Sequence, residues 1–298
     1  MRIPNSSISD SLVSRLQKLT AAQADLQARV SSGQRITVAS DDPAAMERVL
    51  GLQAEQQHIQ QWARNGDHAL GVSQSSFSAV KQLKGISDRA GEIAVLGVGV
   101  NSPDAYHSYS SETDALIEQA LQAANTRQAG EHLFGGTQTD TPPFTATRDS
   151  AGKITAVSYV GTASAAQFRV SEGATIAPKT DGATNQKFAD FLNHLVSLRD
   201  ALTTQSGPGV QAAQSGLHNS ETDLITTISD IGATQTRLES SKGLNESRFT
   251  DLQQLTSSET DADLAQTVVK LTQAQTAYEA ALQSGAQILK HSLLDYLR

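Results

Sequence analysis

Histidine and acidic side chains are the first candidates for chemistry in this sequence, because they can bind metals and transfer protons. The seven histidines are scattered, and no two have the four-residue spacing of a zinc-binding helix. Glu131–His132 lacks the second histidine that such a site requires. Phosphate-binding, dinucleotide-binding and nucleophile-elbow motifs are also absent. We therefore predict no enzyme activity, no metal site and no cofactor.

The adjacent acids Asp41 and Asp42 are a further pair that could hold a cation. They directly precede Pro43, and proline suits the first turn of a helix because its missing N–H has no partner there. Carboxylates also stabilise the positive end of the helix dipole. We therefore interpret this pair as the start of a helix, capped by Ser40 or Asp41, rather than as a metal site.

The composition argues against several functions. Of the 298 residues, 38% are hydrophobic and only 4% aromatic, which favours long helices packed through small side chains. A net charge of −8 disfavours binding to nucleic acid or to an anionic membrane surface. The chain has no cysteine, so disulfides and thiol catalysis are excluded. We expect no cleavable secretory signal and no membrane helix, which needs roughly 18 continuous apolar residues.

Two narrow apolar stripes, one in residues 9–32 and one in residues 260–298, must position whatever surface the chain uses. Their three- and four-residue steps are typical of a coiled-coil seam, and an isolated helix is marginal in water. We therefore predict that the terminal helices pair, and that both stripes also contact neighbouring subunits. The predicted interface consists of Leu12, Leu16, Leu19, Leu26, Val30, Leu264, Val268, Leu271, Tyr278, Leu282, Leu289 and Leu293.

Helix boundaries are predicted from capping residues. Ser9 or Asp10 can begin the first helix, and Gly33 follows its last periodic residue. Thr260 and Asp263 have the spacing of a capping box, which would start the terminal helix at Thr260. A second helix is predicted from Pro43, with a break near Gly85 left open, and a third is predicted to be capped by Ser102.

Short β-type runs at 154–160, 166–170 and 174–178 interrupt the helical pattern. We therefore predict a mainly α fold: an elongated rod of coiled coil and helical bundle formed by both termini, with a small inserted β domain. The predicted domains are a terminal coiled-coil stalk (1–36 and 260–298), a helical bundle (37–136 and 185–259) and the β insert (137–184).

The run SSGQRITVASDDPAA (31–45) and the stretch LTQAQTAYEAALQSGAQILKHSLLDYL (271–297) resemble the flagellin family. The similarity spans about 85% of the chain and is weakest in the β insert. Within the family, the start MRIPNSS, the Asp-Asp-Pro at 41–43 and the passage at 124–144 are more similar to members that join hook and filament than to filament formers. The residues carrying the resemblance are Arg35, Asp41, Asp42 and Pro43, together with Phe134, Gly135 and Gly136.

The resemblance implies a structural subunit of the bacterial flagellum, exported by the flagellar type III apparatus and located outside the cell. It further implies as partners hook-associated protein 1, flagellin, other copies of the chain in a ring, and an export chaperone. Alternatives are a minor filament flagellin or a secreted enzyme built on a flagellin scaffold.

Overall fold

The computed structural model describes residues 5–99 and 102–296, and within them the side chains of residues 10–99 and 102–287. It confirms a mainly α fold with a small β region. The chain forms two compact units: one from its two ends, up to Gln57 and from Thr250 onward, and one from His58–Phe249. The predicted three-part division at residues 36, 136, 184 and 259 stays a prediction.

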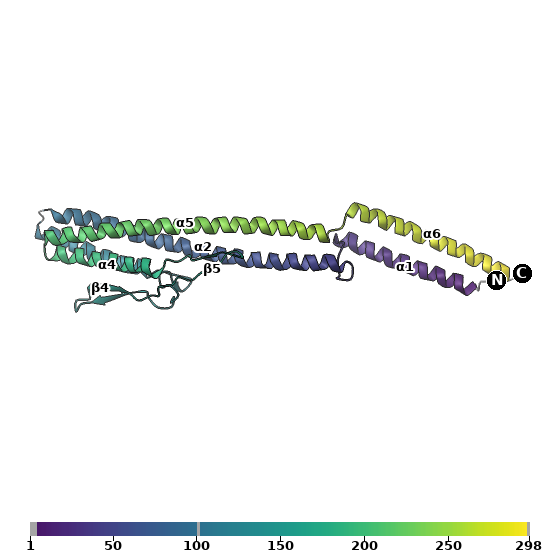
Figure 1. Ribbon diagram of the computed structural model, residues 1–298, viewed down its shortest axis with the longest axis horizontal. Coiled ribbons are helices and arrows are strands. Elements are labelled where there is room, and N and C mark those ends of the chain that lie inside the picture. Colours follow the sequence, from purple (N-terminus) through teal and green to yellow (C-terminus); the bar gives the residue numbers. More distant parts are fainter. Residues whose placement is uncertain (1–4, 100–101, 297–298) are drawn as a thin grey trace. The chain divides into compact units, whose positions relative to one another are not determined.

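In the first unit, helices α1 (Asn5–Ser32) and α6 (Leu264–Tyr296) lie side by side (Figure 1). The first unit also contains the start of α2 (Pro43–Val98) and the end of α5 (Gly207–Thr260). The predicted stripe of α1 is half-buried at every step, while the described residues between its steps are exposed, except the half-buried Arg29. An isolated helix is marginal in water, so α1 depends on packing this stripe against another helix.

One end of α1 lies where the sequence predicts it, and the other does not. The helix already begins at Asn5, so neither Ser9 nor Asp10 is its cap. Its other end is as predicted: Gly33 has a φ of +71° and donates its N–H to the carbonyl oxygen of Arg29 at 2.9 Å. Glycine adopts this left-handed conformation without steric strain, which ends the helix.

Aspartates directly before α2 and α6 cap these helices. Asp42 Oδ1 accepts the N–H of Ala45 at 3.0 Å, so the cap of α2 lies closer to the helix than predicted. Asp263 Oδ1 accepts the N–H of Gln266 at 3.0 Å. The predicted start of α6 at Thr260 is wrong, because Thr260 is the last residue of α5. In both cases the carboxylate reaches the free N–H three residues on.

The second unit packs α3 (Pro103–Ala124) against α4 (Gly182–Thr203), together with the remaining lengths of α2 and α5, around a main core, and a smaller cluster forms beside β5 and β6. Ser102 caps α3 as predicted, accepting the N–H of Ala105 at 3.2 Å. Helix α2 continues through Gly85 without a break. Four phenylalanines are almost completely buried in the core: Phe134, Phe144, Phe188 and Phe191.

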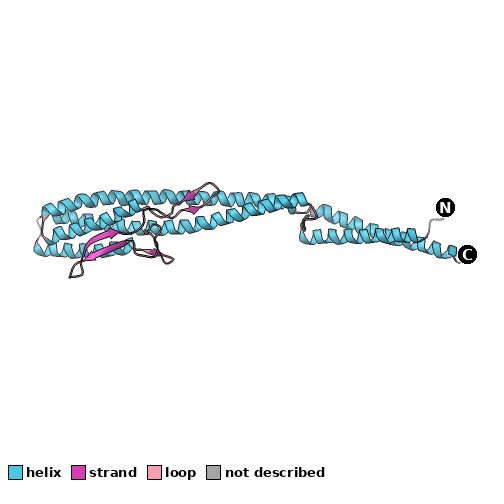
Figure 2. Cartoon of the chain, turned by 60° about the horizontal axis from the view of Figure 1, so that its bottom comes forward, coloured by secondary structure: helices cyan, strands magenta, loops and turns pink. Residues whose placement is uncertain are grey.

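The described strands form three separate antiparallel pairs on the helices of the second unit (Figure 2). The first pair, β1 (Arg127–Gln128) with β2 (Glu131–His132), precedes residue 137, so strand structure begins before the predicted insert. The other pairs are β3 (Phe144–Arg148) with β4 (Ile154–Tyr159), and β5 (Phe168–Arg169) with β6 (Thr175–Ile176).

Asparagine side chains attach the β3–β4 hairpin to the helices. Asn125 exchanges hydrogen bonds of 2.9 and 3.0 Å with the backbone carbonyl and N–H of Phe144. Asn193 of α4 does the same with Val157, at 2.9 and 2.8 Å. Each amide covers part of a strand edge that would otherwise present unpaired backbone groups. The hairpin is therefore fixed to α3 and α4.

Candidate assembly site on the terminal helices

The contact between α1 and α6, here called the seam, is built on small residues of α6. A Cβ added at Gly285 would lie 2.5 Å from Cδ2 of Leu12, so only glycine lets the helices approach this closely here. The α6 residues on this side follow three- and four-residue steps and are half-buried or buried: Thr267, Leu271, Ala274, Tyr278, Ala281 and Gly285.

Seven of the predicted interface residues lie in the seam. They are Leu12, Leu16, Leu19, Leu26, Val30, Leu271 and Tyr278. All seven are only half-buried, so the two helices leave part of each side chain exposed to solvent. The terminal helices therefore pair as predicted. A further helix packed beside them would bury the exposed parts of these side chains.

Three predicted residues lie outside the seam: Leu264, Val268 and Leu282 are 49%, 46% and 45% exposed. At about 100° per residue, they form a second line on α6, roughly 70° around the helix from the seam. We call this line the outer face. The prediction had merged two neighbouring lines into one stripe. Leu289 and Leu293 lie outside the residues whose side chains are described.

The outer face has few charges beside it. Between Leu264 and Gln287, Lys270 and Glu279 are the only residues among Asp, Glu, Lys and Arg. Exposed aliphatic side chains with few neighbouring charges are characteristic of contact surfaces, since the cores of protein interfaces are depleted of charged residues. The outer face therefore has the chemistry of a helix-packing surface, and no described residue of the chain covers it.

Two backbone segments connect the helices of the first unit, and they pair with each other. Residues 34 and 261 form an antiparallel bridge. Beside it, the N–H of Arg35 donates to the carbonyl oxygen of Thr260 at 2.7 Å, and the N–H of Ala262 donates to that of Gly33 at 2.8 Å. Segments more than 220 residues apart in sequence are thus joined directly.

Arginine side chains reinforce this bridge; we call Arg35, Asp42, Arg48 and Glu259 the clasp. Arg35 donates to the carbonyl oxygen of Glu259 at 2.8 Å and to Asp42 Oδ2 at 3.2 Å. Arg48 holds both carboxylate oxygens of Glu259, at 3.2 and 2.8 Å. The hydrogen bonds from Arg48 lower the pKa of Glu259. Bidentate geometry makes this pair more specific than an ordinary surface contact.

The acidic pair before Pro43 serves the backbone: Asp42 lies at the predicted helix start and caps it, whereas Asp41, one of the two predicted caps, accepts from the turn before the helix. The N–H groups of Thr37 and Val38 donate to Asp41 and are the main cause of its lowered pKa. The pKa of Asp42 is lowered first by the N–H of Ala45 and then by Arg35. Both carboxylates therefore already have donors in the turn and the helix that they stabilise.

The motif Phe134–Gly135–Gly136 belongs to the second unit and serves a different purpose. The Phe134 ring packs edge-on against Phe188 with centroids 5.3 Å apart, and its carbonyl oxygen accepts Asn185 Nδ2 at 2.9 Å. Gly136 has a φ of +69°, and an added Cβ would lie 2.3 Å from Thr162 Oγ1. This motif therefore anchors the β region and contributes nothing to the seam.

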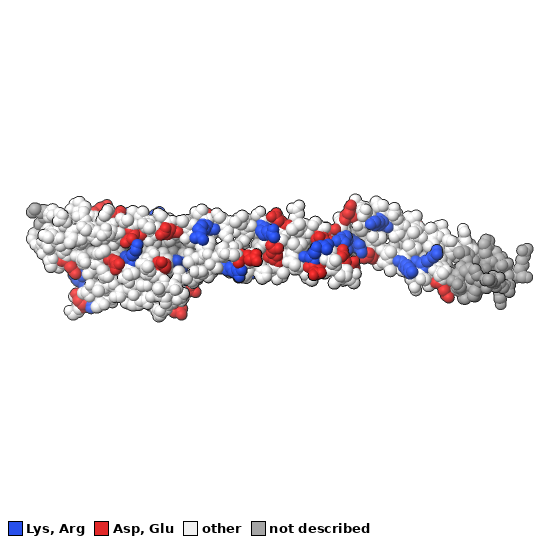
Figure 3. Space-filling model, viewed as in Figure 1, with Lys and Arg blue, Asp and Glu red and all other residues white. Residues whose placement is uncertain are grey.

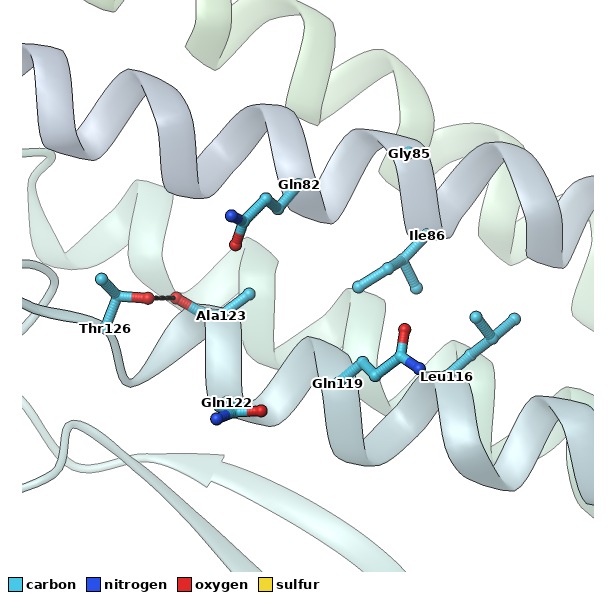
Figure 4. Close-up of a pocket in the computed structure, with 8 residues that line it drawn as sticks. All are labelled: Gln82, Gly85, Ile86, Leu116, Gln119, Gln122, Ala123 and Thr126. Atoms are coloured by element: carbon cyan, nitrogen blue, oxygen red, sulfur yellow. Dashed lines mark hydrogen bonds between the residues drawn. The ribbon is translucent and has the colours of Figure 1, made fainter.

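A hollow of about 600 Å³ lies between α2 and α3 (Figure 4). Its lining contains the amides of Gln82, Gln119 and Gln122 and no ionisable side chain. Among the described residues, no group of three or more His, Asp or Glu could hold a metal ion. None of the described helices combines the length and hydropathy needed to cross a membrane.

Sequence reasoning missed three kinds of residue. Thr267 and Ala281 line the seam, and their three- and four-residue spacing from Leu271 and Tyr278 was the available signal. Arg48 and Glu259 are partners across 211 residues, and no local pattern relates them. The asparagines that hold the strands form contacts that depend on the tertiary fold alone.

Comparison with known proteins relates the N-terminal part of this chain to a known family. Residues 3–139 match the family model described as the bacterial flagellin N-terminal helical region. The resemblance to the flagellin family is therefore confirmed over the N-terminal part of the chain.

Within that class, the chain is similar along its length to flagellar hook-associated protein 3. It is 24% identical to the Escherichia coli protein, over 86% of this chain and 87% of that protein. It is 22% identical to the Salmonella typhimurium protein, over 100% of both. The match to Vibrio parahaemolyticus polar flagellin C, at 26% identity, covers only 36% of this chain and 29% of the flagellin.

The fold agrees with a solved structure. The crystal structure of Bacillus cereus FlgL superposes with a TM-score of 0.60, covering 70% of this chain and 99% of that protein at 15% identity. At this identity the likeness shows the fold alone.

Proposed function

We propose that this chain is a structural subunit of the bacterial flagellum at the junction between hook and filament. It would join hook-associated protein 1 to the first flagellin subunits, in a ring formed with its own copies. The similarity to hook-associated protein 3 along the whole chain supports this assignment, whereas the flagellin match is partial. We infer an extracellular location, export through the flagellar apparatus with the help of a chaperone, and no catalytic role.

The proposed mechanism of subunit assembly rests on the outer face of α6. Leu264, Val268 and Leu282 are exposed on a helix whose neighbouring side is already paired with α1. A helix from an adjacent subunit that packed on this face would bury all three residues and also cover the half-buried edges of Leu271 and Tyr278. Assembly would then complete a core that two helices leave open.

A single charge on the outer face tests this mechanism. We expect Leu282→Asp or Val268→Asp to abolish incorporation into flagella, because an aspartate would be buried without a partner. Val269→Asp is the matched control, since Val269 is 55% exposed but lies on another side of α6. The melting temperature of the monomer should be unchanged in all three variants. Normal swimming of the Leu282→Asp strain would contradict the proposal.

The second candidate, a minor filament flagellin, rests on the partial flagellin match. A junction subunit and a filament flagellin differ in how many subunits assemble. A junction subunit stops after a limited layer, whereas a flagellin continues. Electron microscopy of the purified chain under conditions that polymerise flagellin separates them: long filaments would favour the flagellin.

A further inference from the structure

A line of completely buried residues runs along α2 in the second unit, and two of its members are serines. In three- and four-residue steps, the line consists of Ala69, Ser73, Ser76, Val80 and Leu83. Val80 and Leu83 belong to the main core, whereas Ala69 belongs to the smaller cluster beside β5 and β6. Along this line, the two serines therefore separate one apolar cluster from the other.

Neither serine hydroxyl has a hydrogen-bond partner among the described residues. Other hydroxyls on these helices do: those of Ser78 and Thr227 donate to the carbonyl oxygen four residues earlier, at 3.0 and 2.8 Å. Gln235 Nε2 on α5 is also buried without a described partner. We call Ser73, Ser76 and Gln235 the polar layer. Burying such groups without a hydrogen bond costs free energy, so the layer weakens the contact between the helices.

Gln235 lies near the level of the two serines, because α2 and α5 run antiparallel. Lys84 Nζ lies 3.1 Å from Glu221 Oε1, and Lys242 Nζ lies 2.8 Å from Asp67 Oδ1. Figure 3 shows further opposite charges side by side on the surface. Interpolation between the two ion pairs places Gln235 within about one helical turn of the level of both serines. The buried groups without partners thus gather at one level of the helix pair.

Helices α3 and α4 stop near the same level. Arg89 Nε on α2 lies 2.6 Å from Glu112 Oε1 on α3, and Lys187 Nζ on α4 lies 2.7 Å from Asp223 Oδ1 on α5. Counting along the helices from these ion pairs, α3 ends and α4 begins within about one turn of the level of Ser76. Beyond the polar layer, α2 and α5 continue without α3 and α4.

The part of the second unit beyond the polar layer has a small core of its own. Asn245 Nδ2 donates to the carbonyl oxygen of Val170 at 2.9 Å, which holds β5 and β6 to α5. The buried apolar residues of this part are Ala69, Val170, Ile176 and Leu238. A part with so little apolar burial is a candidate for local unfolding, since opening energies follow the burial that is lost.

We propose that this part, the opening section (residues 58–70, 168–176 and 238–249), unfolds locally while the main core stays folded. Opening brings water to the polar layer, and the hydroxyls and the amide then form the hydrogen bonds that they lack in the closed state. The layer therefore sets the point at which the two long helices separate. This property belongs to the single subunit and does not depend on the proposed function.

Native-state hydrogen exchange of the full chain tests the local opening. Amides of the opening section should exchange at least about tenfold faster than those around Leu83. Leu83→Ala should accelerate exchange in the main core by at least roughly tenfold. It should leave the opening section unchanged, because position 83 stays packed while that section is open. Equal rates in the two parts of the wild type, or equal acceleration of both by Leu83→Ala, would overturn the proposal.

A second substitution tests the role of the polar layer. We expect Ser73→Ala to slow exchange in the opening section by about fivefold, because opening no longer hydrates a buried hydroxyl. Ser240→Ala, at an exposed position of α5 in the same section, is the matched control. It gains the same helix propensity and should slow exchange by no more than about twofold. Equal effects of the two substitutions would overturn the assignment of the layer.

Discussion

Gly285 of α6 and Leu12 of α1 meet at a point where a single methyl group would be too large. A Cβ on Gly285 would lie 2.5 Å from Leu12 Cδ2 and 3.5 Å from both Cδ1 and Cγ. The leucine therefore occupies the space that the missing side chain leaves. Because this contact is specific to one pair of positions, it fixes the register in which α1 and α6 pair.

We expect Gly285→Val to weaken the pairing of α1 and α6, by the roughly 1–3 kcal/mol typical of an overpacked contact. Hydrogen exchange of the α1 amides should become faster. Adding Leu12→Ala should restore much of the protection, because the smaller side chain makes room for the valine. Ala286→Val, at an exposed neighbouring position, is the control. Unchanged exchange in Gly285→Val would show that the register is set elsewhere.

Reversing the charge of Arg48 tests the clasp. We expect Arg48→Glu to expose the amides of Arg35 and Ala262 to faster exchange, because Glu259 loses its bidentate partner. The double variant Arg48→Glu with Glu259→Arg should recover protection. Arg35→Lys should not substitute for arginine, since an ammonium cannot reproduce the planar fork that reaches both Asp42 and the Glu259 carbonyl.

The pH dependence of the clasp follows from the lowered pKa values of Asp42 and Glu259. A carboxylate whose pKa is lowered by folding stabilises the fold fully above its ordinary pKa, near 4, and loses that effect as the pH falls through the lowered value. Amide protection at the bridge should therefore be constant from neutral pH to about 4 and decrease below. Loss of protection already at pH 6 would contradict the assignment.

His132 gives the second unit a different pH dependence. Burial, followed by Arg127 and Lys179, lowers the pKa of its imidazole, while Nδ1 lies 3.0 Å from the carbonyl oxygen of Asn125. The neutral ring is therefore favoured in the fold. Its stabilisation is complete above the ordinary pKa of about 6.5 and is lost as the pH falls through the lowered value.

The urea midpoint of the wild type should accordingly decrease between pH 7.5 and 5. His132→Gln should reduce this decrease, because glutamine can still donate to Asn125 without titrating. The exposed His107→Gln serves as the control and should behave like the wild type. Equal pH profiles of His132→Gln and the wild type would rule out this residue as the cause.

Two glycines with positive φ allow the stability cost of backbone strain to be distinguished from that of steric crowding. Gly130→Ala, at a φ of +91° with nothing near the added Cβ, should cost only the left-handed strain of about 1–2 kcal/mol. Gly136→Ala should cost clearly more, because its Cβ would also lie 2.6 Å from the carbonyl oxygen of Thr162. Urea unfolding measures both variants. Equal midpoints would mean that the loop at Thr162 moves aside.

Much of the helical fold followed from the sequence because its causes are local. The stripe from Leu12 to Val30, the cap at Ser102 and the end at Gly33 each depend on residues within a few positions. The resemblance to flagellins came from two continuous runs, and sequence comparison confirmed it over the N-terminal part of the chain. The start of α6 was misplaced because Thr260 and Asp263 both suit a cap, and local chemistry does not choose between them.

Only the tertiary structure divided the predicted stripe of α6 into a seam and an outer face. Leu271 and Leu282 are equally apolar and fit the same three- and four-residue repeat, so the sequence determined that this helix needs partners. Which side α1 occupies depends on where the chain returns after more than 200 residues, and on the space left by Gly285. The same holds for Arg48 and Glu259: each charge is visible in the sequence, but folding alone brings them together.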